Sequence, residues 1–169
     1  MKLAVISTSR IVEEFVAHLD EMPEIQVTAL CCRPQSRPRA EAWAQQYPLG
    51  RIWTDEAAML AAGGVDAGYI GHAQQLHYDT AKRVLTAGYP VILEKPFTPT
   101  AAEARDLFRL ADEKGTMIFE AITTPYLPAY RFLQNMLPEI GPVRGAMASF
   151  CARSRRYDAY LNGIWNTTF

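Results

Sequence analysis

Two charged residues and a proline end an apolar run in the middle of the sequence. The run is Val91–Leu93, and Glu94, Lys95 and Pro96 follow it directly. Proline biases the residue before it towards extended backbone, so Lys95 is expected to continue the line of the strand. A lysine held there can hydrogen-bond a substrate hydroxyl and move its proton as hydride is transferred. We therefore take Lys95 as the candidate catalytic residue, and a surface Glu-Lys pair is the alternative.

The turn after the first apolar run is a candidate anion site. A dinucleotide fingerprint places G-x-G-x-x-G/A between a strand and a helix, and here Ser7 and Ser9 occupy the two glycine positions and Val12 the third. We expect Ser9 to cap the helix and leave backbone amides pointing at an anion, with an ordinary helix cap as the alternative. The candidate cofactor-binding residues of this turn are Ser7, Thr8, Ser9, Arg10 and Ile11.

The second apolar run, residues 25–32, is followed by a basic residue. An NAD site usually has Asp or Glu at this point to bind the ribose hydroxyls, whereas an arginine suits a 2′-phosphate. Arg33 comes directly after the run, and Ser36, Arg37 and Arg39 are close behind it. Arg33 is thus a candidate cofactor-binding residue, and the pattern favours NADP with NAD as the alternative. The opposing interpretation is that these arginines are solvated loop charges.

A third polar group follows the apolar run at 66–70, where a strand is expected to lead into a helix. Its candidate cofactor-binding members are Gly71, His72, Gln74 and His77. A single loop histidine usually faces solvent, and two of them at one strand end favour a functional interpretation. Residues at the carboxyl ends of parallel strands line one crevice, so this group is expected beside Glu94 and the serine turn.

Apolar runs alternate with helical patterns over the first 122 residues. This alternation implies parallel strands with right-handed crossovers, and nearly all-apolar strands are typical of a sheet covered on both faces. The sequence thus predicts a doubly wound α/β (Rossmann) fold. Expected strands are 2–7, 25–32, 51–54, 66–70, 91–93 and 117–121, and expected helices are 9–20, 39–47, 56–62, 76–87 and a helix capped by Thr100 and Glu103 that ends at 114.

Two helices have a predicted inward face. The first face is Leu76, Thr80, Ala81, Val84 and Leu85, and the second is Ala104, Leu107, Phe108 and Ala111. Composition then changes after Ala121. We expect residues 1–122 to form the nucleotide-binding domain, and 123–169 to form a connector, a helix at 129–137, a strand at 143–152 and no more of a second, substrate or dimerisation domain. A single strand exposes unpaired edges, which predicts a homo-oligomer, strand exchange or disorder after about Pro125.

The composition excludes several classes of partner. The formal net charge is −1 with both signs interspersed, so no nucleic-acid or anionic-membrane partner is expected. No apolar run has the length of a membrane span, and no signal peptide is visible, which favours a cytoplasmic protein. Cys31, Cys32 and Cys151 lack metal-site spacing, so we expect no metal and interpret the first two as small apolar strand residues.

In order along the chain, these motifs resemble the Gfo/Idh/MocA family of oxidoreductases, the glucose–fructose oxidoreductase and inositol dehydrogenase group. The resemblance runs from Lys2 to about Asp158, and Glu94-Lys95-Pro96 is its most diagnostic motif. It implies that Lys95 contacts nicotinamide and substrate, and that Gln74 takes the place of an Asn beside the cofactor. The implied reaction is hydride transfer between nicotinamide and a hydroxyl or carbonyl carbon of a small sugar, polyol or diol.

The sequence also departs from that family. Ser7 and Ser9 replace glycines, and His72-Ala73 replaces a Thr-Pro or similar pair. The family's C-terminal domain, with its Asp-x-x-x-His pair, has no counterpart here, so we expect a truncated chain with little turnover by itself. The alternatives are a non-catalytic dinucleotide-binding sensor or regulatory module, and a vestigial protein that no longer binds nucleotide.

Overall fold

The computed structural model describes residues 1–152 and 157–162 of the chain. The chain divides into two compact units, Met1–Ala121 and Ile122–Phe169, which are considered separately below.

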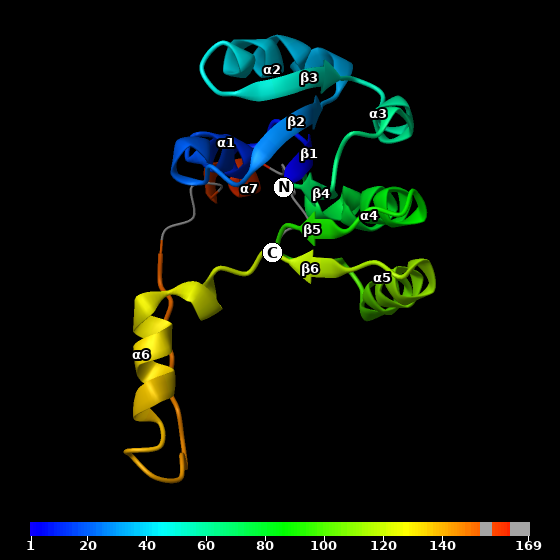
Figure 1. Cartoon of the computed structure of the whole chain (residues 1–169). Helices are drawn as coiled ribbons and strands as arrows, with labels where there is room; N and C mark the ends of the chain where they lie inside the picture. The colour runs from blue at the N-terminus through cyan, green and yellow to red at the C-terminus, as the bar shows by residue number, and fades with distance from the viewer. Residues whose placement is uncertain (153–156, 163–169) are drawn as a thin grey trace. The chain divides into compact units, whose positions relative to one another are not determined.

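The first unit is built on one parallel sheet. Within residues 1–121 the sheet has six strands in the order β3-β2-β1-β4-β5-β6, and each neighbouring pair is parallel (Figure 1). The direction of winding reverses between β1 and β4, which is the switch point where doubly wound sheets bind ligands. The strands are β1 (Lys2–Ile6), β2 (Gln26–Cys31), β3 (Leu49–Trp53), β4 (Ala67–Ile70), β5 (Val91–Leu93) and β6 (Ile118–Glu120).

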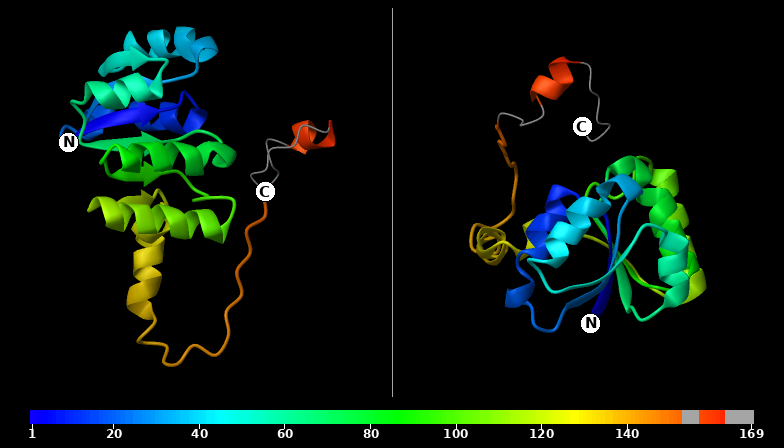
Figure 2. Two further views of the ribbon diagram at one scale, coloured as in Figure 1. Left: turned by 90° about the vertical axis from the view of Figure 1, so that its right-hand side faces the viewer. Right: turned by 90° about the horizontal axis from the view of Figure 1, so that it is seen from above.

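Helices cover the two faces of this sheet. Figure 2, in its right-hand view, shows the blue and cyan helices on one side of the strands and the green helices on the other. One side carries α1 (Arg10–Val16) and α2 (Arg37–Ala44), and the other carries α3 (Glu56–Ala62), α4 (His77–Thr86) and α5 (Ala101–Lys114). Short 3-10 turns precede or join them at η1 (Leu19–Glu21), η2 (Pro34–Ser36) and η3 (Gln74–Leu76). The predicted doubly wound fold is confirmed.

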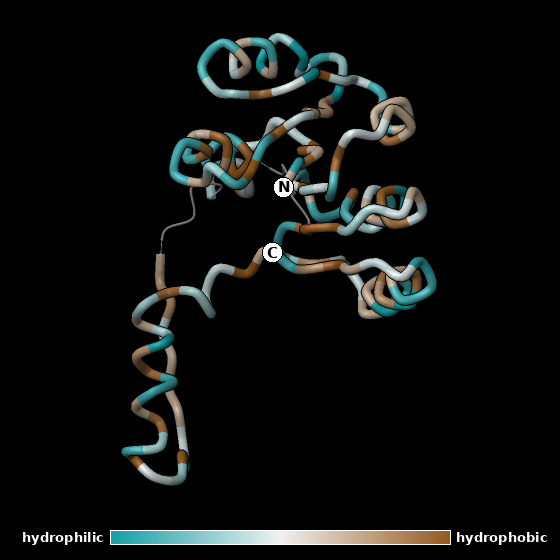
Figure 3. The backbone as a smooth tube through the Cα atoms, in the orientation of Figure 1, coloured by the Kyte–Doolittle hydropathy of each residue, from teal (hydrophilic) through white to brown (hydrophobic). Residues whose placement is uncertain are grey.

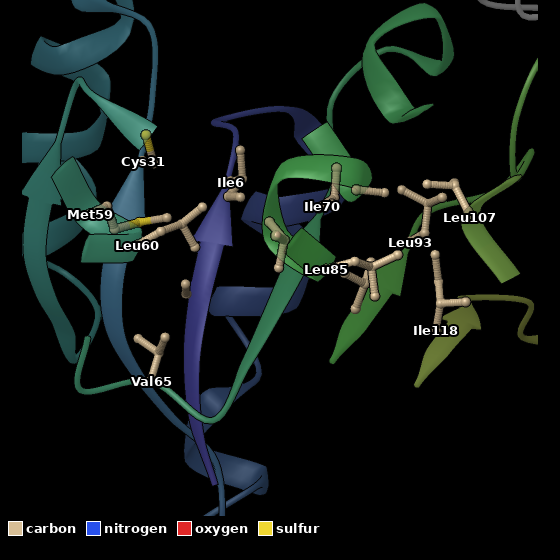
Figure 4. Packing of buried hydrophobic residues seen from close by; sticks show 14 of the residues in the cluster. Ile6, Cys31, Met59, Leu60, Val65, Ile70, Leu85, Leu93, Leu107 and Ile118 are labelled. Atoms are coloured by element: carbon tan, nitrogen blue, oxygen red, sulfur yellow. The ribbon is translucent and has the colours of Figure 1, made fainter. Parts of the chain in front are cut away.

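Side-chain alternation along the strands builds two separate cores. On β1, Leu3 and Val5 pack towards α1 and α2, whereas Ala4 and Ile6 pack towards α3, α4 and α5. Figure 4 shows the second core, in which residues such as Leu85 and Leu93 interdigitate between sheet and helices. Full burial of each such side chain contributes roughly 1.5–3 kcal/mol, so these layers hold the loops at the sheet edge in place.

Two residues assigned to inward helix faces are in fact exposed. Leu76 is 49% exposed because it ends η3, before the helical face of α4 begins. Phe108 is 51% exposed, and its ring stacks on Phe97 with centroids 5.2 Å apart. Their neighbours Thr80, Ala81, Val84 and Leu85 on α4, and Leu107 and Ala111 on α5, are buried as predicted.

The second unit contains helices and irregular segments in the residues described. It comprises η4 (Thr124–Tyr126), α6 (Pro128–Met136) and α7 (Tyr157–Leu161). The tube of α6 in Figure 3 carries hydrophobic and hydrophilic residues along its whole length, and Phe132 and Leu133 are more than 60% exposed. The strand predicted at 143–152 is wrong, since those residues have no strand structure. A strand requires a hydrogen-bonded neighbour, and the described part of this unit offers none.

None of the helices described has the length and hydropathy needed to span a bilayer.

The capping box at the start of α5 provides a test of the fold. Thr100 accepts a hydrogen bond from the Glu103 amide, and the Glu103 carboxylate accepts one from the Thr100 amide. Thr100→Ala should lower the free energy of unfolding, measured in urea, by about 1 kcal/mol because the cap oxygen is lost. Thr100→Ser keeps that oxygen and should stay close to the parent chain. Equal losses in the two variants would contradict the cap.

Candidate functional site

The parallel register brings four loops to one edge of the sheet. The Ser7 amide donates to Cys31 O at 2.9 Å, and the Gly71 amide donates to Ile6 O at 3.1 Å. The Glu94 amide continues the ladder by donating to Ile70 O at 3.0 Å. Residues that are far apart in the sequence therefore leave their strands side by side.

A pocket of about 550 Å³ opens at this edge. It is formed by the ends of β1, β2 and β3 and the loop after β4, together with residues of α2, α3 and α4. Its lining residues are Ile6, Ser7, Thr8, Ser9, Cys31, Cys32, Arg33, Pro34, Ser36, Arg39, Thr54, Glu56, His72, Ala73, Leu76, Asp79, Thr80 and Arg83.

The serine turn lies in the pocket wall, with a strained backbone. Ser7 has φ +126°, a region that glycine enters freely and that L residues rarely adopt. The Ser7 hydroxyl accepts a hydrogen bond from the Ser9 amide at 3.0 Å, which stabilises the turn. The expectation that Ser9 caps α1 with its side chain is wrong, because the Ser9 hydroxyl instead donates to the Gly71 carbonyl.

Gly71 allows α1 to lie close to the end of β4. A Cβ atom added to Gly71 would overlap the Val12 side chain, which is completely buried. The third glycine of a dinucleotide fingerprint normally supplies this close packing of helix and strand. Here Val12 occupies that position, and Gly71 on the facing loop leaves the space.

Two of the three arginines after β2 belong to the pocket. Arg33 and Arg39 line it together with Ser36, and Arg39 Nη1 also donates to the Thr8 carbonyl at 3.3 Å. Arg37 is outside the lining and pairs with Glu41 one helical turn away. The sequence predicted Arg33 as a cofactor-binding residue, and the structure adds Arg39 to the same pocket. Arg39 lies in the first turn of α2, and its side chain contacts the serine turn at Thr8.

His72 lies half-buried in the pocket wall as a neutral ring. Burial, with the nearby His77 and Arg83 charges, lowers the pKa of His72 to about 4, although a hydrogen bond to Ala73 O opposes the shift. Its Nδ1 is 3.2 Å from Ala73 O, and its Nε2 is 2.9 Å from the Thr80 hydroxyl.

His77 lies behind the pocket and joins two loops. The ring is 1% exposed and begins α4. Its Nδ1 is 3.0 Å from both Pro96 O and Phe97 O, and its Nε2 is 3.0 Å from His72 O. His77 thus connects the loop after β4 to the loop after β5, which is the loop that carries Lys95.

Glu94 is buried and holds the start of that second loop. Its carboxylate accepts a hydrogen bond from the Tyr69 hydroxyl at 3.0 Å and one from the Lys95 amide at 3.2 Å. Burial, followed by the charge of Glu94, raises the pKa of the Tyr69 phenol. Lys95 itself is exposed, and a cis peptide bond joins it to Pro96.

The pocket unites only part of the predicted site. Ser7, Thr8, Ser9, Arg33 and His72 line it. The predicted residues outside its lining are Arg10, Ile11, Gly71, Gln74, His77, Glu94 and Lys95. Gln74 is buried, whereas Arg10 is exposed and pairs with Glu14.

Several polar pocket residues were not predicted from the sequence. Thr54 follows β3 directly, so its place after a parallel strand was an available signal. Glu56, Asp79, Thr80 and Arg83 come from α3 and α4. Their helical positions are ordinary in the sequence, and only the packing of these helices over the sheet brings them together.

The two strand cysteines are buried as predicted. Burial, with the Glu56 charge adding to it, raises the pKa of Cys31 to about 12, and burial also raises the pKa of Cys32. Among the described residues, no group of three or more His, Cys, Asp and Glu side chains could hold a metal ion.

Sequence comparison finds related oxidoreductases. The model of the oxidoreductase family with an NAD-binding Rossmann fold (GFO_IDH_MocA) matches residues 1–122. The scyllo-inositol 2-dehydrogenase (NADP+) IolU of Bacillus subtilis is 32% identical over 163 residues, 96% of this chain and 49% of that protein. The trans-1,2-dihydrobenzene-1,2-diol dehydrogenase of Homo sapiens is 30% identical over 154 residues, 89% of this chain and 46% of that protein. The chain spans about half the length of these curated relatives.

Comparison with solved structures also finds oxidoreductases. KijD10, a 3-ketoreductase from Actinomadura kijaniata crystallised with NADP, superposes with a TM-score of 0.75 at 28% identity, covering 82% of this chain and 44% of that one. A Thermotoga maritima protein described as a probable dehydrogenase, at 15% identity and a TM-score of 0.74, shares the fold.

Two substitutions of Ser7 separate the effect of backbone strain on stability from that of the hydroxyl hydrogen bond. Ser7→Ala removes the hydroxyl, and Ser7→Gly removes the hydroxyl and the Cβ atom together. The glycine variant should have a free energy of unfolding about 1 kcal/mol above that of the alanine variant, because only glycine relaxes at positive φ. Urea unfolding measures both. An alanine variant as stable as the glycine variant would show that Ser7 is not strained.

The cysteines make a prediction about reactivity. Their raised pKa and burial keep Cys31 and Cys32 as protonated thiols, whereas Cys151 is exposed. A thiol reagent at pH 8 should therefore label one cysteine per folded chain quickly and all three in urea. Mass mapping of the labelled peptides should place the fast site at Cys151. Fast labelling of Cys31 would contradict the buried arrangement.

Proposed function

The chain belongs to the Gfo/Idh/MocA oxidoreductase family, and on that premise we propose that it is the nucleotide-binding half of an NADP-dependent dehydrogenase. The membership confirms the resemblance drawn from the sequence motifs. In the proposed reaction, hydride passes between nicotinamide and a hydroxyl or carbonyl carbon of a small polyhydroxy substrate, such as a sugar, polyol or diol. The inositol and dihydrodiol dehydrogenases among the relatives support this class of substrate.

The observation that carries the proposal is that Arg33, Ser36 and Arg39 all line the same pocket. Neither arginine is neutralised there by an acidic residue directly after β2. Planar guanidinium groups bind phosphate with two parallel hydrogen bonds, so this corner suits the 2′-phosphate of NADP better than the free hydroxyl of NAD. NAD is the alternative cofactor.

The remaining pocket fits a dinucleotide in size and in chemistry. A volume of about 550 Å³ falls within the range of cofactor clefts. Ser7, Thr8 and Ser9 would border the phosphates, and His72 would border the base. The other proposed cofactor-binding residues lie outside the pocket lining: Arg10, Ile11, Gly71, Gln74, His77, Glu94 and Lys95.

Lys95 is our proposed catalytic residue. When bound, the nicotinamide supplies or accepts the hydride, and Lys95 would donate a hydrogen bond to the reacting oxygen and carry its proton. Two buried neighbours support this placement, since Glu94 accepts from the Lys95 amide and His77 contacts the carbonyls of Pro96 and Phe97. The loop is thereby fixed on both sides of the lysine.

We further propose that residues 1–122 hold the cofactor and that 123–169 begin the substrate or dimerisation domain of a longer, homo-oligomeric protein. The relatives, about twice as long as this chain, support that division. That the protein has no nucleic-acid or membrane partner is proposed on the formal net charge of −1 with both signs interspersed. A cytoplasmic location is proposed because free cysteine thiols fit a reducing compartment.

Titration of the chain with NADPH and NADH, followed by nicotinamide fluorescence, tests this function. NADPH should bind about tenfold tighter than NADH, and Arg33→Ala should remove most of that preference, since a charge-assisted hydrogen bond contributes roughly 1.5–3 kcal/mol. Arg37→Ala is the matched control, because Arg37 pairs with Glu41 outside the pocket. It should leave both affinities unchanged.

Two results would contradict the proposal. Binding of neither cofactor would mean that the pocket is not a dinucleotide site. Equal affinity for NADPH and NADH, or equal effects of the Arg33 and Arg37 substitutions, would remove the assignment of the 2′-phosphate to Arg33.

A further inference from the structure

Glu56, Thr80 and Arg83 line the pocket but have no role in the function proposed above. They form a chain of polar contacts that ends at His72. It begins with Glu56 and Arg83, whose side chains meet at two points: Nε to Oε1 at 2.9 Å and Nη2 to Oε2 at 3.1 Å. Both residues line the pocket, and the Glu56 side chain is 17% exposed. A two-point pair of this kind holds the guanidinium plane in one orientation.

In this orientation Arg83 also contacts the buried hydroxyl of Thr80. Its Nη2 also donates to Thr80 Oγ1 at 3.0 Å, and Thr80 is 3% exposed. A hydroxyl has one hydrogen to donate and two lone pairs that accept. With one lone pair occupied by Arg83, the hydroxyl hydrogen is free to point at His72 Nε2, 2.9 Å away.

The other nitrogen of His72 is determined independently. Its Nδ1 is 3.2 Å from the Ala73 carbonyl oxygen, which can only accept a hydrogen bond. This contact favours a hydrogen on Nδ1, and in that neutral tautomer Nε2 accepts a hydrogen bond. A Thr80 hydroxyl that donates to Nε2 favours the same tautomer, so the two contacts together hold the ring in it.

We propose that Arg83 and Thr80 are positioning residues that fix His72 as a neutral, Nδ1-protonated ring in the wall of the cofactor pocket. The inference rests on the proposed function only where it names the ligand. Glu56 orients Arg83, Arg83 orients the Thr80 hydroxyl, and that hydroxyl holds the ring.

A neutral His72 adds to an uncharged part of the pocket lining. His72, Ala73 and Leu76 make up this part, whereas Arg33 and Arg39 supply cationic groups that attract phosphate. The uncharged part suits an aromatic base, here the adenine of the dinucleotide. A cationic His72 would instead attract the phosphates towards this part of the lining.

The charges that face His72 favour its neutral form. His77 lies with its ring centroid 5.5 Å away at the start of α4, and Arg83 comes from the end of the same helix. Glu56, from α3, is engaged by Arg83 and does not contact the ring. Together with burial, these groups give His72 a pKa of about 4, so the ring is uncharged from mildly acidic pH upwards.

The ring tautomer can be read directly from the ¹⁵N shifts of His72 in the cofactor-free chain between pH 5.5 and 8. The parent chain should show one Nδ1–H tautomer without titration. Thr80→Val, which keeps the shape and removes the hydroxyl, and Arg83→Met should both mix the tautomers and raise the pH at which His72 takes up a proton. Thr80→Ser should restore the parent spectrum, and Thr86→Val, on the same helix but outside the pocket, is the unrelated control.

NADPH titration then tests the role of the fixed ring. Thr80→Val and Arg83→Met should weaken NADPH about three- to tenfold at pH 6, a loss of roughly 0.7–1.4 kcal/mol, with a smaller effect at pH 8. An unchanged tautomer in both variants would overturn the positioning role, and a changed tautomer with unchanged affinity would overturn the assignment to the cofactor pocket. If the parent chain binds no dinucleotide, the proposed function fails while the tautomer measurement still decides the positioning role.

Discussion

Everything in the candidate site depends on the parallel hydrogen-bonded register of β1 with β2 and β4. That register makes the three strands end together, so the Ser7 amide bonds to Cys31 and the Gly71 amide to Ile6. The buried layers on both faces of the sheet oppose slippage of the strands, because a one-residue shift would turn every side chain of a strand towards the opposite core, where it does not fit the packing. The loops that follow β1, β2 and β4, from Ser7 to His72, are thereby held in the lining of one pocket.

The serine turn shows how the fold tolerates departures from a glycine fingerprint. The first serine adopts a backbone angle that favours glycine, and its own hydroxyl supports the turn by accepting from the Ser9 amide. The close packing normally allowed by the third glycine is supplied from the other side, by Gly71 facing Val12. The close approach of helix and strand therefore depends on Gly71, which lies on a different loop from the serine turn. A glycine fingerprint sought along the serine turn alone could not reveal it.

The two histidines after β4 have separate tasks although they are five residues apart. His72 faces the pocket and is held through Thr80, whereas His77 is buried and bonds to backbone carbonyls of both neighbouring loops. The 3-10 turn η3 separates them, so His72 belongs to the loop after β4 and lines the pocket, whereas His77 begins α4 and is buried. Contacts with His77 and Glu94 relate the loop carrying Lys95 to the pocket wall, so the proposed proton-transfer residue is positioned by the same elements as the cofactor site.

The sequence by itself determined the doubly wound fold, the order of its elements, the α5 capping box and the loops that carry the site. These features follow from local periodicity and from cap chemistry, which are written in consecutive residues. Tertiary structure decided that Arg39 and not Arg37 enters the pocket, that Leu76 lines it, and that Glu56, Arg83 and Thr80 act on His72. These depend on how α2, α3 and α4 rotate about their axes as they pack on the sheet. Successive residues of a helix point about 100° apart, so the rotation of a helix about its axis decides which of its side chains face the pocket. No local sequence pattern encodes that rotation.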